Sequence, residues 1–167
     1  MLHDTTGSAC FEWSRRIASF GRRFLIRTND PDLLELLPGL LPPLAVPSTA
    51  ASFDRTFSLR RPGPCPCGAE HGSATLFGGR QMLFRGPDVA LACLRLRTAL
   101  KLDVAELARR RVFLHAGAVA WDGLGIVIPG GTMSGKTTLV RELLRAGALY
   151  YSDEYAVVDG RGCLHPY

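Results

Sequence analysis

Lysine is scarce in this sequence, which has 2 lysines and 18 arginines among its 167 residues. The formal net charge is +5, but the arginines are spread along the chain and form no patch, so the composition does not favour a nucleic-acid partner. Proline or glycine interrupts every long uncharged stretch before it reaches the length of a membrane-spanning helix. The N-terminal residues also lack the apolar core of a signal peptide. We therefore expect a cytoplasmic protein that binds neither membranes nor nucleic acid.

The number of cysteines is odd, five, and without a secretory signal this argues against a disulfide framework. Cys65 and Cys67 lie close to His71 in a loop rich in proline and glycine, and these residue types also bind zinc. Structural zinc has four ligands, usually with two to four residues between paired cysteines, whereas this loop offers no obvious fourth ligand. We interpret it as a loop with incidental thiols, and metal binding is the alternative.

The chain is predicted to have three parts, which are a flexible leader (1–17), an α+β region (18–86) and a P-loop domain (87–167). In the α+β region, Gly78 and Gly79 tolerate the positive φ of a tight turn. The flanking segments, 75–77 and 80–84, are therefore predicted to form a hairpin. The overall fold class that we expect is α/β with a mixed sheet.

The third part begins with a long amphipathic helix, predicted over residues 87–110. Its apolar residues recur at spacings of three and four, which places on one face Val89, Cys93, Leu96, Leu100, Val104 and Leu107. The pattern then becomes strand-like over 112–120 and 124–128, with Asp122 and Gly123 in a tight turn between the two runs. We expect this strand pair to enter a buried sheet.

Residues 130–137 match the phosphate-binding pattern G-x-x-x-x-G-K-[ST]. Glycine at both ends lets the backbone curl, so that successive N–H groups face one phosphate. The following helix directs its positive end at the same phosphate. In this pattern Lys136 reaches the β- and γ-phosphates, and Thr137 offers a hydroxyl to Mg²⁺. A strand-like run precedes the loop and an amphipathic helix follows it as far as Gly147, so the context also indicates a nucleotide site.

Two acidic residues and one histidine accompany the loop. Asp153 and Glu154 end a strand-like run after the P-loop helix, where carboxylates can bind Mg²⁺ and orient or deprotonate a nucleophile. A solvated turn between two strands is the alternative for this pair. His115 lies on the strand before the P-loop strand, and a satisfied core histidine is the alternative to a site role.

Together these residues resemble a known family. The His115 strand, the P-loop and the acidic pair look like the C-terminal catalytic domain of HPr kinase/phosphorylase, and more closely the bacterial HPr-kinase-like proteins with a different N-terminal half. The resemblance covers roughly residues 111–167. It implies a P-loop core of the HPr kinase/PEP-carboxykinase type, binding of Mg²⁺ and ATP, and transfer of the γ-phosphoryl group to a serine of a protein or peptide.

The resemblance also implies a role for each matching position. Asp153 would act as the general base, His115 would lie beside the phosphates, and Thr137 and Glu154 would bind the metal. Lys136 would act in catalysis and in binding. The nucleotide would contact Gly130, Gly131, Thr132, Met133, Ser134, Gly135, Lys136, Thr137 and Thr138.

This chain departs from the family in two ways. The family's acidic pair is Asp-Asp, whereas Glu154 is one methylene longer and would shift the metal. The sequence also ends at Tyr167, soon after the P-loop, although an α/β domain normally needs further elements to cover its sheet. We therefore expect an incomplete domain.

Three functions follow from these observations. The first is an HPr-type serine kinase, and the second is an inactive nucleotide-binding regulatory module or fragment, which both departures favour. A small-molecule P-loop kinase ranks last, because such enzymes usually carry the loop near the start of the chain. Assembly into homo-oligomers is left open.

Overall fold

The computed structural model describes residues 10–65, 68, 70–131 and 133–167. The first two strands of its first sheet are joined by a tight turn whose two residues have positive φ. Phe20 and Gly21, with φ of 47° and 79°, join strand β1 (Trp13–Ser19) to β2 (Arg22–Thr28). Consecutive positive φ values match the right-handed twist of the paired strands. Because β1 includes Trp13 to Ile17, the prediction of a flexible leader over 1–17 is wrong for its last five residues.

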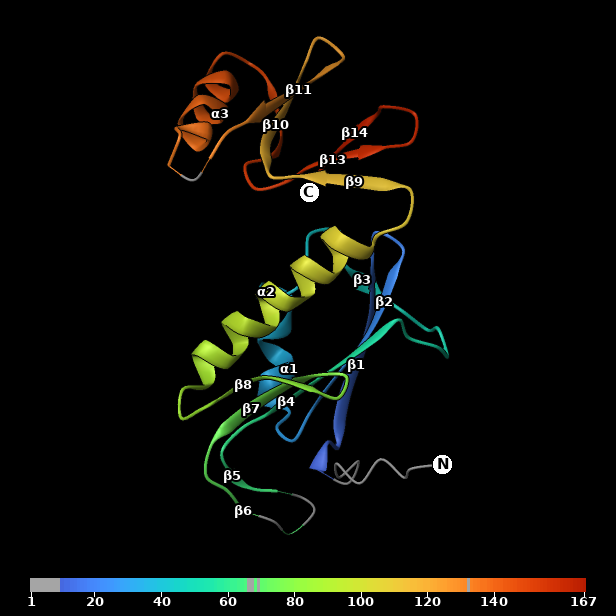
Figure 1. Cartoon of the computed structure of the whole chain (residues 1–167), viewed down its shortest axis with the longest axis vertical. Coiled ribbons are helices and arrows are strands. Elements are labelled where there is room, and N and C mark those ends of the chain that lie inside the picture. The colour runs from blue at the N-terminus through green and yellow to red at the C-terminus, as the bar shows by residue number, and fades with distance from the viewer. Residues whose placement is uncertain (1–9, 66–67, 69, 132) are drawn as a thin grey trace. The chain divides into compact units, whose positions relative to one another are not determined.

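The sheet has six strands in the order β3-β1-β2-β4-β7-β8 (Figure 1). Strands β2 and β4 are parallel and all other neighbours are antiparallel, so the expected mixed sheet is confirmed. The predicted hairpin is formed by β7 and β8, but its turn is Gly79 and Arg80, because Gly78 is the last residue of β7 and only Gly79 of the two glycines has a positive φ. The other strands of this half are β3 (Val46–Pro47), β4 (Arg55–Arg60), β5 (Gly63–Pro64), β6 (Glu70–His71), β7 (Ala74–Gly78) and β8 (Gln81–Gly86).

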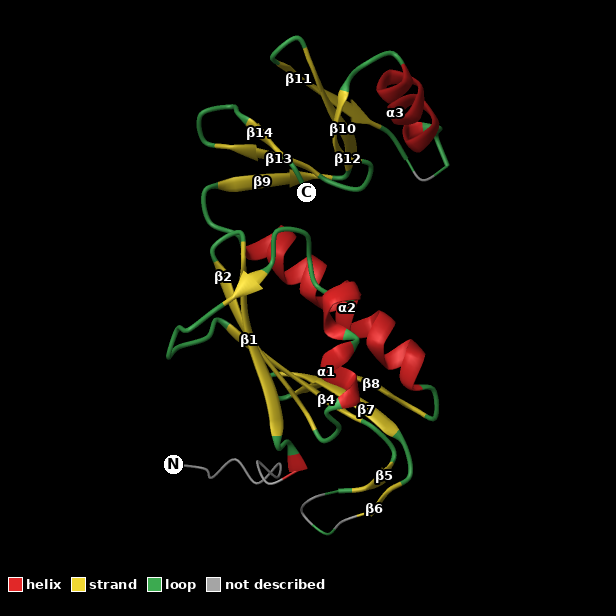
Figure 2. Cartoon of the chain, turned by 180° about the vertical axis from the view of Figure 1, so that it is seen from behind, coloured by secondary structure: helices red, strands yellow, loops and turns green. Residues whose placement is uncertain are grey.

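Helix α2 (Val89–Leu107) lies across one face of this sheet (Figure 2). The predicted apolar stripe is largely confirmed, since Cys93, Leu96, Leu100 and Val104 are buried. A fully buried aliphatic side chain stabilises the fold by roughly 1.5–3 kcal/mol, so this stripe fixes the helix on the sheet. Two short helical segments, α1 (Asp32–Glu35) and η2 (Leu37–Gly39), precede it in the chain.

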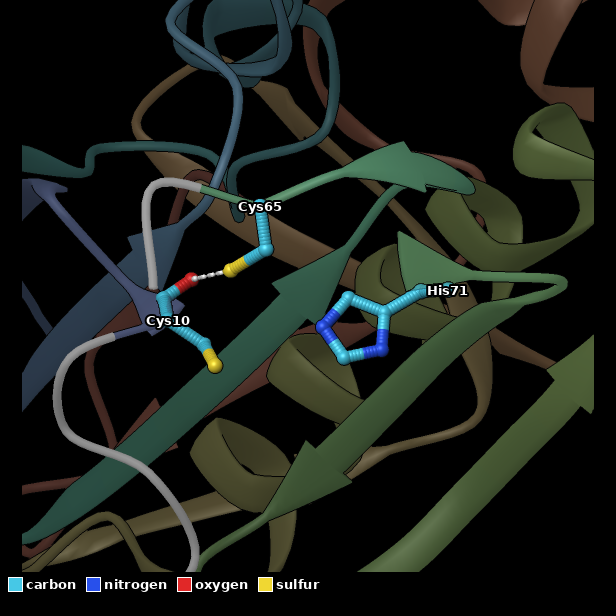
Figure 3. Close-up of side chains that lie close together, drawn as sticks. All are labelled: Cys10, Cys65 and His71. Carbon is cyan, nitrogen blue, oxygen red and sulfur yellow. Dashed lines mark hydrogen bonds between the residues drawn. The ribbon is translucent and has the colours of Figure 1, made fainter. Parts of the chain in front are cut away.

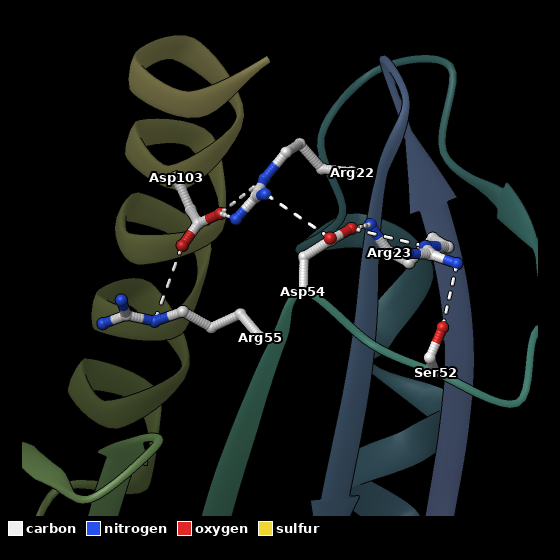
Figure 4. Close-up of polar contacts among 6 residues, drawn as sticks. All are labelled: Arg22, Arg23, Ser52, Asp54, Arg55 and Asp103. Carbon is white, nitrogen blue, oxygen red and sulfur yellow. Dashed lines mark hydrogen bonds and ion pairs between the residues drawn. The ribbon is translucent and has the colours of Figure 1, made fainter. Parts of the chain in front are cut away.

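Asp103 near the end of α2 joins the helix to two strands of the sheet (Figure 4). Its carboxylate is 2.9 Å from a guanidinium nitrogen of Arg22 on β2 and 3.5 Å from Nε of Arg55 on β4. Asp54 also faces Arg22 at 3.7 Å and accepts a hydrogen bond from the backbone N–H of Arg23, which lowers the pKa of Asp54. The Asp103 side chain is only 5% exposed, so the two arginines compensate a carboxylate that has lost most of its water.

These contacts determine where the chain divides. The first compact unit is Met1–Val104 and the second is Ala105–Tyr167. The sequence placed the boundary at residue 87 instead, because the long helix precedes the P-loop directly. The buried stripe and Asp103 assign most of α2 to the first unit.

The second unit contains two three-stranded antiparallel sheets, β11-β10-β12 and β14-β13-β9. The predicted turn is present at Asp122 and Gly123, with φ of 47° and 78°. The predicted strand over 112–120 is two strands, because the chain bends at His115. The elements are β9 (Arg111–Leu114), β10 (Ala116–Trp121), β11 (Leu124–Pro129), α3 (Lys136–Arg145), β12 (Leu149–Ser152), β13 (Ala156–Asp159) and β14 (Leu164–His165).

Two small apolar clusters lie in the second unit. Val119 of β10 packs with Val140 of α3 and Ala148, and Gly117 permits the close approach of the helix, because a Cβ there would be 2.8 Å from Val140 Cγ2. The other cluster contains Ala116, Ala118 and Ala156. Within the described ranges, no helix of the chain has the length and apolar character needed to cross a membrane.

Candidate functional site

The loop between β11 and α3 contains the phosphate-binding motif. Ser134 N–H donates to the carbonyl of Gly131 at 3.2 Å, and Gly135 precedes the first helical residue with φ of 86°. A Cβ on Gly130 would collide with the Ser134 hydroxyl, so the first glycine of the motif is required by close packing. Met133 has φ of 62° and is 98% exposed. Thr132, which the sequence assigns to the same loop, lies outside the described residues.

Lys136 is the first residue of α3, and its side chain folds back over the loop. Its Nζ donates to the carbonyls of Gly130 and Gly131, both at 2.7 Å. Thr137 and Thr138 follow in the first helical turn and are exposed. The N–H groups of a first turn lack helical acceptors, so the amides and the threonine hydroxyls of this segment can face an anion, while the Lys136 ammonium group is held by the loop carbonyls.

The acidic pair lies in the turn after β12. Buried Ser152 holds this turn, because its hydroxyl accepts hydrogen bonds from the backbone N–H groups of Glu154 and Tyr155, both at 3.0 Å. The Tyr150 hydroxyl donates to Asp153 Oδ1 at 2.9 Å. Partial burial and this hydrogen bond raise the pKa of Tyr150. The turn is therefore a defined structure with one oxygen of Asp153 engaged by a neutral donor.

His115 occupies a different setting from the predicted one. The sequence placed it within a strand, whereas the structure places it at the exposed bend between β9 and β10. The bend arises because β9 pairs with β13 while β10 pairs with β11 and β12, so the two segments belong to different sheets. The ring is 6.0 Å from that of Tyr155, edge to face. Its position argues against the alternative of a core histidine.

An aromatic cluster, formed by a residue of β9, a residue of the turn and the residue Tyr167, packs against the acidic turn. The rings of Phe113, Tyr155 and Tyr167 meet edge to face, with centroids 5.2–6.2 Å apart. Such pairs stabilise by about 0.5–1.5 kcal/mol beyond their buried area. Burial also raises the pKa of Tyr155 and of Tyr167. Because Tyr155 follows Glu154 directly, this cluster fixes the end of the acidic turn.

Strand register brings the three predicted features to one edge of a sheet. Pro129, the last residue before the loop, pairs with Ala116, which follows His115. Ser152, the last residue before the acidic pair, pairs with Ala118 on the other side of β10. Strands β11 and β12 both run antiparallel to β10, so their carboxyl ends lie at the same edge. The loop, His115 and the acidic turn therefore converge although they are distant in sequence.

The residues at this edge have the chemistry that a magnesium nucleotide requires. The Thr137 hydroxyl and the Glu154 carboxylate are hard oxygen donors of the kind that bind Mg²⁺. Gly130 has no side chain that would displace the Ser134 hydroxyl or the Lys136 side chain, so both polar groups lie close to the loop backbone. The donor set and the loop geometry thus fit the expected group.

A hollow of about 690 Å³ lies elsewhere in the second unit. Leu124, Leu149 and Leu164 contribute to its apolar lining, together with Gly125, whose missing side chain leaves room for Leu164. Among the described residues, none of the loop, the acidic pair or His115 lines this hollow. It is therefore separate from the edge at which the polar groups converge.

A second group of polar side chains lies in the first unit, where sequence reasoning recognised only part of it. Cys65 and His71 are joined by Cys10, and the ligand atoms of the three side chains lie within 4.8 Å of one another (Figure 3). Cys67, the other candidate zinc ligand of this loop in the sequence, lies outside the described residues. Cys10 was missed because it is 55 residues from Cys65 in sequence and fell in the predicted leader, and no local pattern reports such a contact.

Comparisons with known proteins identify no relative of this chain, because no family model, no curated protein and no solved structure matches it.

Proposed function

We propose that this chain is a phosphotransferase of the HPr kinase type, which binds Mg²⁺-ATP on the loop over 130–137 and transfers the γ-phosphoryl group to a serine hydroxyl of a protein. The observation that carries the proposal is the register of β10, which pairs the end of the P-loop strand and the end of the acidic strand with the residues that follow His115. The P-loop core type and a cytoplasmic location are part of this proposal.

Lys136 is the cation of the proposed site. In the structure its ammonium group is held by two loop carbonyls, which keeps it at the mouth of the loop. A triphosphate is a stronger acceptor than a neutral carbonyl, so the flexible side chain would exchange these bonds for phosphate oxygens. Bound Mg²⁺-ATP would supply a γ-phosphoryl group whose negative charge is partly neutralised, and Thr137 and Glu154 would hold its metal.

Asp153 is the proposed general base. The Tyr150 hydroxyl already donates to Oδ1, so the proton of an attacking serine would be accepted at Oδ2. The hydrogen bond also fixes the carboxylate plane, and Ser152 fixes the backbone that carries it. His115 lies at the same edge, where its ring would contact the phosphates. Positioning and charge neutralisation, more than covalent chemistry, would provide the acceleration.

The test of binding uses the chain's two lysines. Calorimetric titration of the purified chain with Mg²⁺-ATP should give saturable binding. Lys136→Ala should weaken this binding by at least about tenfold, since a charge-assisted hydrogen bond contributes about 1.5–3 kcal/mol. Lys101→Ala is the matched control, because it removes the chain's other lysine, which lies on α2 away from the loop sequence. Equal ATP binding by the wild type and Lys136→Ala would refute the proposal.

The test of catalysis separates the kinase from a regulatory nucleotide-binding module. The wild type should transfer label from γ-labelled ATP to serine in a mixture of candidate proteins. Asp153→Asn should abolish this transfer while it retains ATP binding, because the amide cannot accept the proton. Binding without label transfer in the wild type would favour the regulatory module.

A further inference from the structure

The short β5–β6 hairpin of the first unit brings two potential metal ligands next to a third from a distant segment. His71 ends β6 and pairs with Gly63 of β5, and Cys65 follows β5 directly. Cys10 lies just before β1, and Arg27 stacks over the ring of Phe11 with 4.9 Å to its centroid, which fixes the neighbouring backbone. All three side chains therefore belong to the first unit.

The spacing of the three side chains fits a tetrahedral metal. Their ligand atoms lie within 4.8 Å of one another. Zinc bonds of about 2.0–2.3 Å place neighbouring ligand atoms roughly 3.3–3.8 Å apart. Small rotations about side-chain torsions would close this difference, so the backbone is already positioned for coordination.

The surroundings of the group point to a ligand more than to packing. Nε2 of His71 is shielded from solvent and makes no hydrogen bond to any of the described residues. A buried ring nitrogen without a partner is costly, commonly by about 1–3 kcal/mol. The Cys65 side chain is buried, and its thiol donates a long, weak bond of 3.7 Å to the Cys10 carbonyl. A metal bound by these atoms would satisfy the imidazole and replace the weak thiol contact.

We propose that Cys10, Cys65 and His71 supply three ligands of a Zn²⁺ ion that joins the segment before β1 to the β5–β6 hairpin, with water in the fourth tetrahedral position. Two thiolates and an imidazole form a donor set of intermediate softness, which binds zinc in preference to magnesium or calcium. Because the ligands come from segments that separate on unfolding, the ion would bind the folded unit more strongly than the unfolded chain. The site is independent of the nucleotide site proposed above.

The experiment measures metal on the full chain, purified under reducing conditions without a chelator. Elemental analysis should find one zinc per chain, and substitution with Co²⁺ should give a thiolate-to-cobalt charge-transfer band and the visible absorption of tetrahedral cobalt. Chelation should lower the melting temperature of the first unit. These measurements on the wild type decide the proposal even if a variant fails to fold.

Variants then assign the ligands. Cys10→Ser, Cys65→Ser and His71→Ala should each weaken Zn²⁺ binding by at least about a hundredfold, since loss of even an outer-shell partner costs 10–100-fold. Cys163→Ser, which changes an exposed cysteine of the second unit, is the matched control and should retain the metal. A wild type that binds neither Zn²⁺ nor tetrahedral Co²⁺, a Cys10–Cys65 disulfide found by non-reducing mass spectrometry, or equal loss of metal in the control would overturn the proposal.

Discussion

The two units of this chain differ in how many large side chains they bury. Of the twelve largest side chains that are fully buried in the described structure, ten lie in the first unit, Phe24 and Phe57 among them, and two, Val119 and Val157, lie in the second. The second unit instead exposes Leu124 and Leu149, 71% and 67% exposed, on its small antiparallel sheets. The polar groups of the second unit, which lie in the P-loop, at His115 and in the acidic turn, are on loops and turns at one edge of a sheet.

This difference follows the usual separation of framework and function. A side chain in a close-packed core cannot move toward a ligand, whereas loop residues at a strand end can present backbone amides and charges to one. The second unit accommodates positive φ at Met133 and Gly135, directly beside Lys136. We therefore expect substitutions in the first unit to change stability and substitutions at the loop to change binding.

The largest expected effect is on the first unit. Asp103→Ala removes the carboxylate that Arg22 and Arg55 share. Because Arg22 keeps Asp54 at 3.7 Å and the Arg55 side chain is 36% exposed, we expect the loss at the lower end of the about 3–5 kcal/mol typical of a broken buried pair. Hydrogen exchange should become faster at the amides of β2 and β4, while exchange in β10 stays the same. Glu35→Ala, at an exposed acid of α1, is the control. Equal acceleration in β10 would show that the two units unfold together.

The next effect concerns the loop of the second unit. In Gly130→Ala the new methyl group meets the Ser134 hydroxyl, so the loop must open and affinity for Mg²⁺-ATP should fall by at least about tenfold, or 1.4 kcal/mol. Gly131→Ala should lose less, because, apart from the neighbouring residues of the chain, no described atom lies within 4 Å of a Cβ there. Calorimetric titration measures both, and the melting temperature of the first unit should not change. An order of losses opposite to this would contradict the loop geometry.

The smallest effect is a pH dependence within the second unit. The hydrogen bond from His165, at 2.8 Å, and backbone N–H groups of Arg161 and Cys163 lower the pKa of Asp159 to about 2. Because the folded pKa is depressed below 3.8, this stabilisation is present above about pH 4 and is lost as the pH falls through 2. Asp159→Asn should remove that part of the acid-induced loss of stability. Hydrogen exchange at the amides of β13, measured as a function of pH, would detect the change.

The histidine provides the matching control for this acid transition. His165→Ala should raise the pKa of Asp159 only part of the way to its ordinary value, since the two backbone donors remain. Nuclear magnetic resonance titration of the Asp159 carboxyl would measure the change. A carboxyl that titrates near 3.8 in the wild type would contradict the contribution of this pair.

The turns and helices that were predicted correctly from the sequence are those whose structure depends on neighbouring residues in the chain. The turn at Asp122 and Gly123 and the helix after the P-loop are confirmed, because turn φ values and helical periodicity are set within a few residues. The hairpin near Gly78 and Gly79 is confirmed with its turn shifted by one residue, to Gly79 and Arg80. The motif spacing and the acidic pair were also visible. The function that they indicate stays a prediction.

Tertiary structure alone decided which distant residues meet. The helix α2 belongs to the first unit because Asp103 pairs with arginines more than 40 residues earlier, which its amphipathic pattern does not encode. His115 lies at a bend because the strands on its two sides join different sheets. Cys10 meets Cys65 and His71 only in the folded first unit, because the segment before β1 and the β5–β6 hairpin are far apart in sequence. Local preferences are written in short stretches of sequence, whereas these contacts depend on how all the strands pair.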